Sequence, residues 1–120
     1  MMLKGLKPIF ISLAIFLGGA NVVFGAELSQ IIGLWEMKHD TDGDPKDHLE
    51  FSKSGAVAAI RNDGRRTEGL YQLEGDVVTM IYPLPNGMAY KTSMNLNKNN
   101  QLILYSTKTK GMATYERIRP

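Results

Sequence analysis

The chain has 120 residues, of which 43% are hydrophobic and 22% charged, and it contains no cysteine. This length suits one small folded domain and excludes anything larger. The 14 basic and 12 acidic residues give a formal net charge of +2, which is too small to indicate nucleic-acid binding by bulk electrostatics.

The N-terminal segment has the pattern of a secretory signal peptide. Lys4 and Lys7 form a positively charged start, residues 8–17 are almost entirely apolar, and small residues follow them. We expect cleavage after Gly25 or Ala26. The alternative is an uncleaved membrane anchor, because the segment approaches the roughly 20 apolar residues that a membrane span needs.

Export determines the compartment and the charge balance of the mature protein. A signal peptide over residues 1–26 leaves one domain over residues 27–120. Its two lysines are lost with it, so 12 basic residues remain against 12 acidic ones. We therefore expect a neutral protein in the periplasm or outside the cell, with no nucleic-acid partner and no stable membrane span after cleavage. Without disulfides, the domain must rely on its hydrophobic core alone.

The mature chain is predicted to be all-β after one helical turn at Leu28–Ile32. Short runs rich in Val, Ile, Tyr and Thr alternate with turn residues, and no long apolar period of 3.6 residues occurs. The eight predicted strands are Gly33–Lys38, His48–Ser52, Ala56–Asn62, Thr67–Leu73, Val77–Tyr82, Met88–Leu96, Gln101–Thr107 and Met112–Ile118.

The connections between these strands predict their topology. They are short and contain residues that tolerate positive φ, as in Asn86-Gly87 and Lys110-Gly111. Such connections join antiparallel neighbours, because a parallel crossover needs a dozen or more residues. A meander of eight strands exposes two long edges unless it closes. We therefore predict an antiparallel up-and-down barrel or a strongly curled sheet.

Alternation along the strands predicts which side chains face inward. Ala56–Ile60 is apolar on both faces and leaves the register there open, and Ile103 and Tyr105 are expected to face outward. The predicted inward sets are Leu49 and Phe51; Tyr71 and Leu73; Val78, Met80 and Tyr82; Tyr90, Thr92, Met94 and Leu96; and Leu102 and Leu104.

Ordered motifs accompany the strand pattern. Gly33-Leu34-Trp35 opens the first strand, Phe51 precedes Ser54-Gly55, residues 69–76 read GLYQLEGD, and residues 115–118 read YERI. In this order the motifs resemble the small exported lipocalin-like proteins of bacteria. The resemblance covers nearly all of the mature chain and implies a lipocalin-like barrel.

The same resemblance implies a structural signature at one end of the barrel. Gly33 and Trp35 begin the first strand, and Trp35 would pack against an arginine from the end of the sheet. Arg117 is the expected partner, with Arg119 as the alternative. A guanidinium on an indole face would close that end, and its role would be structural rather than functional.

The interior of an eight-stranded barrel is either filled by side chains or holds one small ligand. In the first case the large Tyr and Met residues, including Tyr115, are core. In the second they line a pocket for a small apolar or amphipathic molecule. The candidate ligand-binding residues are Tyr71, Met80, Tyr82, Tyr90 and Met94, with Arg61 as a polar handle.

The loop from His39 to His48 concentrates four carboxylates and both histidines. With Asp40 as position one of an EF-hand, position six is Pro45 instead of Gly and position twelve is Phe51 instead of Glu. No standard transition-metal spacing is present either. We interpret the segment as a solvated acidic loop at the barrel mouth and expect no metal or other cofactor.

Enzymatic activity is not expected. The chain has no cysteine nucleophile, no Gly-x-Ser-x-Gly elbow, no paired-histidine zinc helix and no phosphate loop. Arg61, Arg65 and Arg66 form a basic hairpin tip that we interpret as solubilising. Leu84 and Met88 are apolar in a stiff segment with two prolines, and they either cover a barrel end as a lid or contact a partner protein.

Two functional hypotheses follow. The first is an exported, non-enzymatic, lipocalin-like binding module for a small apolar or amphipathic ligand. The alternative is a protein-interaction factor with a filled barrel, such as an inhibitor, an immunity protein or an envelope assembly protein. A weaker third hypothesis is a metal carrier that uses His39 and His48.

Overall fold

The computed structural model describes residues 25–120, so the predicted signal peptide lies outside the described residues except for its last two positions. The predicted strands are all present, and each strand end lies within two residues of its expected position. The elements are α1 (Leu28–Ile31), β2 (Gly33–Asp40), β3 (His48–Phe51), β4 (Ala56–Ile60), β5 (Arg66–Glu74), β6 (Val77–Pro83), β7 (Ala89–Leu96), β8 (Gln101–Tyr105) and β9 (Met112–Arg119).

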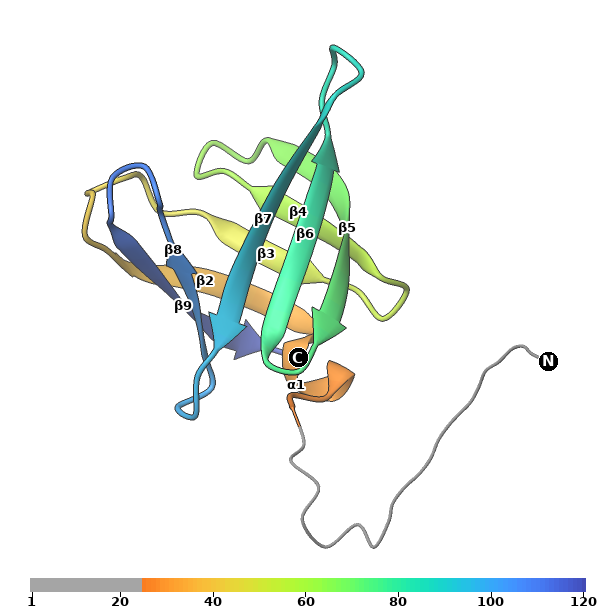
Figure 1. The fold of residues 1–120 in the computed structure, drawn as a ribbon, viewed down its shortest axis with the longest axis vertical. Helices are drawn as coiled ribbons and strands as arrows, with labels where there is room; N and C mark the ends of the chain where they lie inside the picture. Colours follow the sequence, from red (N-terminus) through yellow and green to blue (C-terminus); the bar gives the residue numbers. More distant parts are fainter. Residues whose placement is uncertain (1–24) are drawn as a thin grey trace, which may run out of the picture.

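The strands close into an antiparallel barrel (Figure 1). Each strand pairs with the next one in the chain, and β9 pairs with β2 from Leu34↔Arg119 to Asp40↔Ala113. The closed form of the predicted architecture is therefore confirmed. Within the described residues, no helix has the length and hydrophobicity needed to span a membrane.

The core consists of the inward side chains of all eight strands together with Ile31 of α1. Most of the predicted inward residues are buried, and Met80 and Met94 have only 2% and 1% of their surface exposed. Tyr90 is the exception, because 56% of its surface is exposed although it shares a face with Met94. The expectation that Tyr90 belongs to the core is therefore wrong.

Two outward positions are also buried. Ile103 was expected to face water, but it lies between the strands that carry Asn95 and Thr114 and is shielded there. Ala58 lies between Glu50 and Glu68 in register, and Arg66 bridges these two carboxylates at 3.2 and 3.0 Å. Ala58, with 3% of its surface exposed, is thus flanked by ion-paired side chains on both neighbouring strands.

One end of the barrel is closed by α1. The fully buried side chain of Ile31 fills this end, and its carbonyl oxygen accepts a 2.8 Å hydrogen bond from the Trp35 indole nitrogen. Arg117 donates to the carbonyl oxygens of Ser29 and Ile32 at 2.9 and 3.0 Å. Its guanidinium carbon lies 6.0 Å from the centroid of the Trp35 ring. Arg117 thus occupies the place that the resemblance assigns to it.

Gly33 is required where β2 begins. Its φ of +134° lies in a region that side chains rarely adopt. A Cβ atom at this position would also collide with the carbonyl oxygen of Arg119 on the neighbouring strand. The glycine therefore permits the close approach of the first and last strands that closes the barrel.

Arg117→Ala should lower the free energy of unfolding by about 1–3 kcal/mol, because it removes two charge-assisted hydrogen bonds and the contact with Trp35. Urea denaturation followed by Trp35 fluorescence measures this loss. Arg119→Ala is the matched control on the same strand and should change the free energy by under about 0.5 kcal/mol. Equal effects of the two substitutions would show that Arg117 does not close the barrel end.

Candidate binding site

The end of the barrel opposite α1 is the mouth, and four connections meet there. Because the strands run up and down, the loops after β2, β4, β6 and β8 all lie at this end (Figure 1). The β6–β7 hairpin projects beyond the others, whereas the β2–β3 and β8–β9 loops lie side by side. The acidic loop between β2 and β3 therefore lies at the mouth, as the sequence predicts.

A cleft of about 810 Å³ opens between β7 and β8 at the mouth. We call it the mouth cleft. Its floor is formed by apolar side chains that face inward, and its rim is formed by the acidic loop and the β8–β9 loop. The lining includes Met37, Leu104, Ala113 and Tyr115 in the floor, Tyr90, Thr92 and Tyr105 in the walls, and the charged residues Asp40, Asp42, Asp44, Asp47, Lys91 and Lys108.

The cleft exists because β7 and β8 separate. β7 pairs with β6 along its whole length, from Val77↔Asn95 to Pro83↔Ala89. It pairs with β8 only at Asn95↔Ile103 and Leu96↔Leu102, next to the turn that joins the two strands. Beyond this turn the strands diverge (Figure 1). The cleft therefore passes through the barrel wall as well as opening at its mouth.

Alternate residues of β7 form backbone hydrogen bonds to β6, and the bonds at the two ends of this ladder show which residues these are. Leu84 N–H donates to Met88 at 2.8 Å, and Leu96 N–H donates to Asp76 at 2.8 Å. In an antiparallel ladder every second residue bonds to the same neighbour, so Thr92 and its even-numbered neighbours bond to β6. Lys91 and Ser93 direct their backbone N–H and C=O groups into the mouth cleft, where they have no strand partner within residues 25–120.

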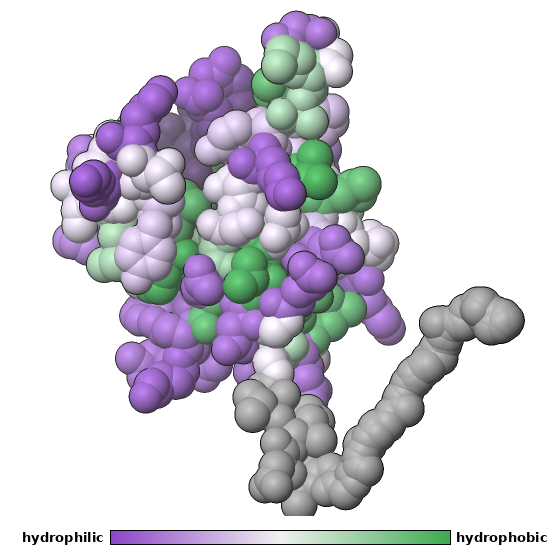
Figure 2. All heavy atoms as spheres, viewed as in Figure 1, coloured by the Kyte–Doolittle hydropathy of each residue, from purple (hydrophilic) through white to green (hydrophobic). Residues whose placement is uncertain are grey.

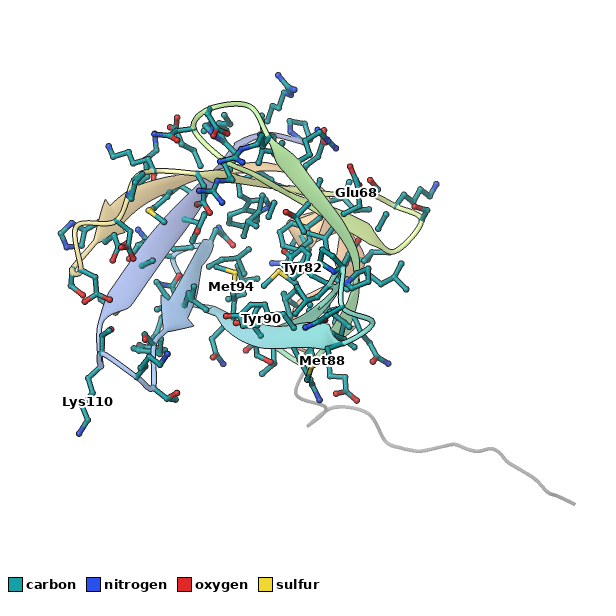
Figure 3. All side chains as sticks on the ribbon, turned by 90° about the horizontal axis from the view of Figure 1, so that it is seen from above. Glu68, Tyr82, Met88, Tyr90, Met94 and Lys110 are labelled. Carbon is teal, nitrogen blue, oxygen red and sulfur yellow. The ribbon has the colours of Figure 1, made fainter. Side chains whose placement is uncertain are left out.

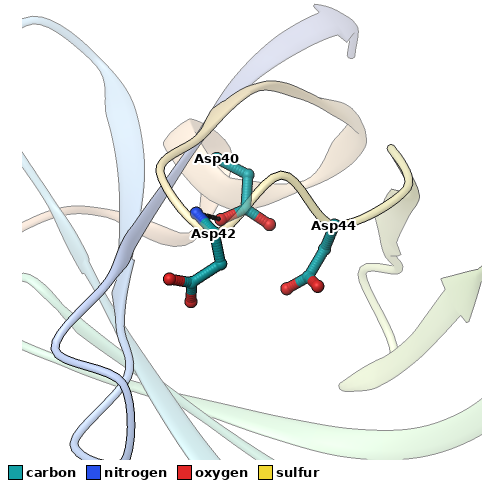
Figure 4. Close-up of side chains that lie close together, drawn as sticks. All are labelled: Asp40, Asp42 and Asp44. Atoms are coloured by element: carbon teal, nitrogen blue, oxygen red, sulfur yellow. Dashed lines mark hydrogen bonds between the residues drawn. The ribbon is translucent and has the colours of Figure 1, made fainter.

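Three carboxylates of the rim come from one loop. Oxygen atoms of Asp40, Asp42 and Asp44 lie within 4.8 Å of one another (Figure 4). Asp40 accepts the Asp42 backbone N–H at 2.9 Å. The charge of Asp40 raises the pKa of Asp44 above its usual value. The cluster contains neither histidine, and His48 instead pairs with Glu36 at 3.3 Å.

Hydrogen bonds tie the acidic loop to the β8–β9 loop. Asp42 accepts a 2.6 Å hydrogen bond from the Thr109 hydroxyl, and its carboxylate lies so close to Gly111 that a Cβ there would collide with it. Thr41 exchanges hydrogen bonds with the backbone of Met112 at 2.8 and 3.0 Å. The positive φ of this turn belongs to Lys110 rather than to Gly111. The feature that favours glycine at position 111 is the close approach of the Asp42 carboxylate.

A second polar group connects the rim with the floor. The hydroxyl of buried Tyr115 donates to the half-buried carboxylate of Asp47 at 2.6 Å. Burial raises the pKa of Asp47, and the hydrogen bond from Tyr115 opposes this rise. Burial and the carboxylate raise the pKa of Tyr115, and burial raises the pKa of nearby Tyr82 to about 12. Both phenols are therefore neutral donors at physiological pH.

The predicted ligand-binding residues separate into three groups. Tyr71, Met80, Tyr82 and Met94 are buried in the core, where Tyr71 bonds to the Ser52 carbonyl oxygen and packs edge-on against Phe51. Of the predicted set, only Tyr90 lines the mouth cleft. Arg61 is exposed in the β4–β5 turn and is not part of the cleft lining. Figure 3 shows Tyr82, Tyr90 and Met94 within the ring of strands.

Sequence reasoning did not identify Met37 and Asp47 as site residues. Met37 continues the alternation that begins at Gly33 and Trp35, so extending the inward set along the first strand would have found it. Asp47 immediately precedes β3, and no local pattern distinguishes it from the other aspartates of the loop. Its role follows only from the contact with Tyr115, which is 68 residues away in the chain.

Comparison with known proteins supports the fold. No protein-family model and no curated protein sequence matches the chain. Among solved structures, the chain is similar to a lipocalin-like protein from Bacteroides uniformis, with 19% sequence identity and a TM-score of 0.53. The match covers 74% of this chain and 99% of the other. The domain therefore has the lipocalin-like fold that the sequence motifs indicated.

The separation of β7 and β8 predicts an alternating pattern of amide hydrogen exchange. The amides of Lys91 and Ser93 should exchange about tenfold or more faster than those of Thr92 and Met94, which bond to β6. Residue-resolved exchange by NMR measures the difference. Equal protection of all four amides would mean that β7 and β8 pair along their whole length in solution.

The environment of Asp47 predicts a pH dependence of stability. Its pKa in the folded state is raised above the unfolded value of about 3.9, so its contribution to stability is lost as the pH rises through the folded pKa. Asp47→Asn does not titrate and retains an acceptor for Tyr115. The unfolding free energy of this variant should therefore increase relative to the native protein between about pH 3 and about pH 7.

Chemical denaturation at both pH values measures this difference in unfolding free energy between Asp47→Asn and the native protein. Tyr115→Phe is the control, because it removes the hydrogen bond that opposes the rise in the pKa of Asp47. In this variant, which keeps Asp47, the unfolding free energy should fall more steeply with pH than in the native protein. A difference in unfolding free energy between Asp47→Asn and the native protein that does not change with pH would contradict the prediction.

Proposed function

We propose that this protein is an exported, non-enzymatic binding module that holds a small amphipathic ligand in the mouth cleft. The observation that carries the proposal is the cleft itself. Its volume of about 810 Å³ lies within the roughly 300–1,000 Å³ of typical ligand pockets. The lipocalin-like fold supports a binding role, since its barrel offers such a site at the open end.

The distribution of polar and apolar groups supports an amphipathic ligand. Met37 and Leu104 offer apolar contacts in the floor, and Tyr90 and Tyr115 add rings with polar tips. The rim carries the carboxylates of the acidic loop. A molecule with one apolar end and one polar end can contact both regions, whereas a wholly apolar molecule would use the floor alone.

The proposed site lies above the predicted one. Met80 and Met94 belong to the tightly packed half of the barrel, together with Trp35, Phe51 and Leu102. A ligand in contact with Met80 and Met94 would have to displace core side chains. The mouth cleft needs no such rearrangement, and Tyr90 already lies with more than half of its surface accessible.

Export and the absence of catalysis are parts of the same proposal. Export rests on the charge and apolar pattern of residues 1–26. For catalysis, an activated hydroxyl nucleophile would need a histidine or another base beside it. Within residues 25–120, no hydroxyl that lines the cleft is hydrogen-bonded to a histidine, and the Thr109 and Tyr115 hydroxyls donate to aspartates of the rim.

A second candidate function is protein interaction through the β6–β7 hairpin. Leu84 and Met88 have 38% and 65% of their surface exposed, so the alternative that they cover the barrel as a lid is wrong. The turn is held by the Leu84–Met88 backbone bond and by Asn86, which accepts the Met88 N–H at 3.0 Å. Figure 2 shows hydrophobic residues at this projecting tip. A stiff apolar tip favours contact with a partner protein.

A neutral fluorescent probe, N-phenyl-1-naphthylamine, distinguishes the two candidates. We expect saturable binding with one site per protein and at least about tenfold weaker binding to Tyr90→Ala, because this change removes an aromatic wall of the cleft. Met88→Ala is the matched control at an exposed apolar residue on the hairpin, outside the cleft lining. It should leave the affinity unchanged.

Probe titration of the three proteins gives the result directly. Loss of binding in Met88→Ala but not in Tyr90→Ala would move the site to the hairpin. No saturable binding to the native protein would contradict the cleft as a ligand site. Native mass spectrometry of protein purified from the cell envelope, before and after denaturation, would then show whether a natural ligand accompanies it.

A further inference from the structure

The mouth cleft has a property that a simple pocket lacks, because one of its walls is the free edge of a β-strand. Lys91 and Ser93 present two N–H and two C=O groups to the cleft, at the spacing of an antiparallel ladder. Free edges are templates for another strand, and proteins usually cover or shorten them. Here the free part of β7 is reached through an opening in the wall.

The opposite wall contributes to the same geometry. β8 bonds to β9 through its even-numbered residues, since Ser106 N–H donates to Gly111 at 2.9 Å at the end of that ladder. The backbone of Tyr105 therefore faces β7 across the cleft. Both walls offer backbone groups, and both carry an aromatic side chain, Tyr90 on β7 and Tyr105 on β8.

We infer that the amphipathic ligand of the mouth cleft is a short, extended, basic peptide segment that pairs with the free edge of β7. This inference rests on the proposed function and names the chemical class of its ligand. The added strand would hydrogen-bond to Lys91 and Ser93 and place alternate side chains on the two faces of the sheet.

The two faces define the pattern of the peptide. Side chains opposite Tyr90 and Thr92 point into the barrel mouth, toward the apolar floor that includes Leu104. Side chains opposite Lys91 and Ser93 point outward to water. The preferred segment therefore alternates apolar and polar residues, which is the strand form of an amphipathic ligand.

Charge at the rim favours a basic peptide. The lining contains four carboxylates, from Asp40, Asp42, Asp44 and Asp47, against the two ammonium groups of Lys91 and Lys108. The carboxylates lie on the loop across the mouth from β7, whereas Lys91 lies on the outer face of the sheet. A lysine or arginine at the mouth end of the peptide would meet the acidic side of the cleft.

The test uses a capped peptide, acetyl-Thr-Val-Lys-Val-Thr-Val-Lys-Val-amide, titrated into the mature protein by calorimetry. Pairing through the backbone tolerates many sequences, so this pattern should bind with one site per protein. The same peptide extended by two lysines at its C-terminal end, which an antiparallel strand places at the mouth, should bind about tenfold more tightly than one extended there by two glutamates, and salt should weaken the binding of the lysine-extended peptide.

Two N-methylated peptides test strand pairing without changing the protein. If the Val side chains point inward, the amides of Thr and Lys face β7. Methylation of those amides should abolish binding, whereas methylation of the Val amides should change the affinity by less than about threefold. Equal binding of both methylated peptides to the native protein would overturn strand pairing.

A pair of protein variants tests the same contact from the other side. Ser93→Pro removes the N–H that faces the cleft and leaves the bonds of Thr92 and Met94 to β6 intact. It should weaken peptide binding by about tenfold. Ser93→Ala keeps the N–H and should bind like the native protein. An unchanged affinity of Ser93→Pro, with an unchanged melting temperature, would contradict the inference.

Failure of the peptide and failure of the proposed function give different results. If N-phenyl-1-naphthylamine binds the cleft and no peptide binds or competes with it, the cleft is a ligand site and the peptide inference is wrong. If neither binds, the proposed function itself is wrong. Slower exchange of the Lys91 and Ser93 amides in the presence of the peptide would support pairing at this edge.

Discussion

The barrel depends on one interaction at its closed end, the clamp that Arg117 forms between the last strand and the start of the domain. Its guanidinium holds the carbonyl oxygens of Ser29 and Ile32, which are 88 and 85 residues away in the chain, and lies over Trp35. Because β9 closes the barrel against β2, this clamp also joins the two ends of the sheet. Closing so long a loop is entropically costly, so the contacts that close it must be strong and specific.

The packed closed end of the barrel explains why the cleft lies at the mouth. A domain of this size without disulfides needs most of its interior for a packed core, and Trp35, Phe51 and Met80 fill it. A cavity at the same level would remove contacts that the small core requires. The open space therefore lies where β7 and β8 diverge, above Tyr82, and this lipocalin-like barrel combines a filled half with an open half.

The fold could be predicted because strands and turns leave local patterns in the sequence. The site could not be predicted, because it depends on contacts between residues that are far apart in the chain. The alternation of Val78, Met80 and Tyr82 and the short turns indicated strands, pairing and direction correctly. The same alternation placed Tyr90 in the core with Met94, yet only Met94 is buried. Tyr90 lies in the part of β7 that no longer pairs with β8. No pattern within β7 records the path of β8. Likewise, the contact of Asp42 with Gly111 could be seen only once the two loops lay together.

Specific hydrogen bonds accompany the divergence of β7 and β8 at both ends of the two strands. At their shared turn, the side chain of Asn97 accepts the N–H groups of Asn99 and Gln101 at 2.9 Å each and holds the strands together. At the far end, Asp42 bonds to Thr109 and draws the β8–β9 loop toward the acidic loop, while β7 follows β6 into the projecting hairpin. Beyond their shared turn, the two strands therefore bond to different partners. The Asp42–Thr109 hydrogen bond also fixes a carboxylate at the rim of the cleft.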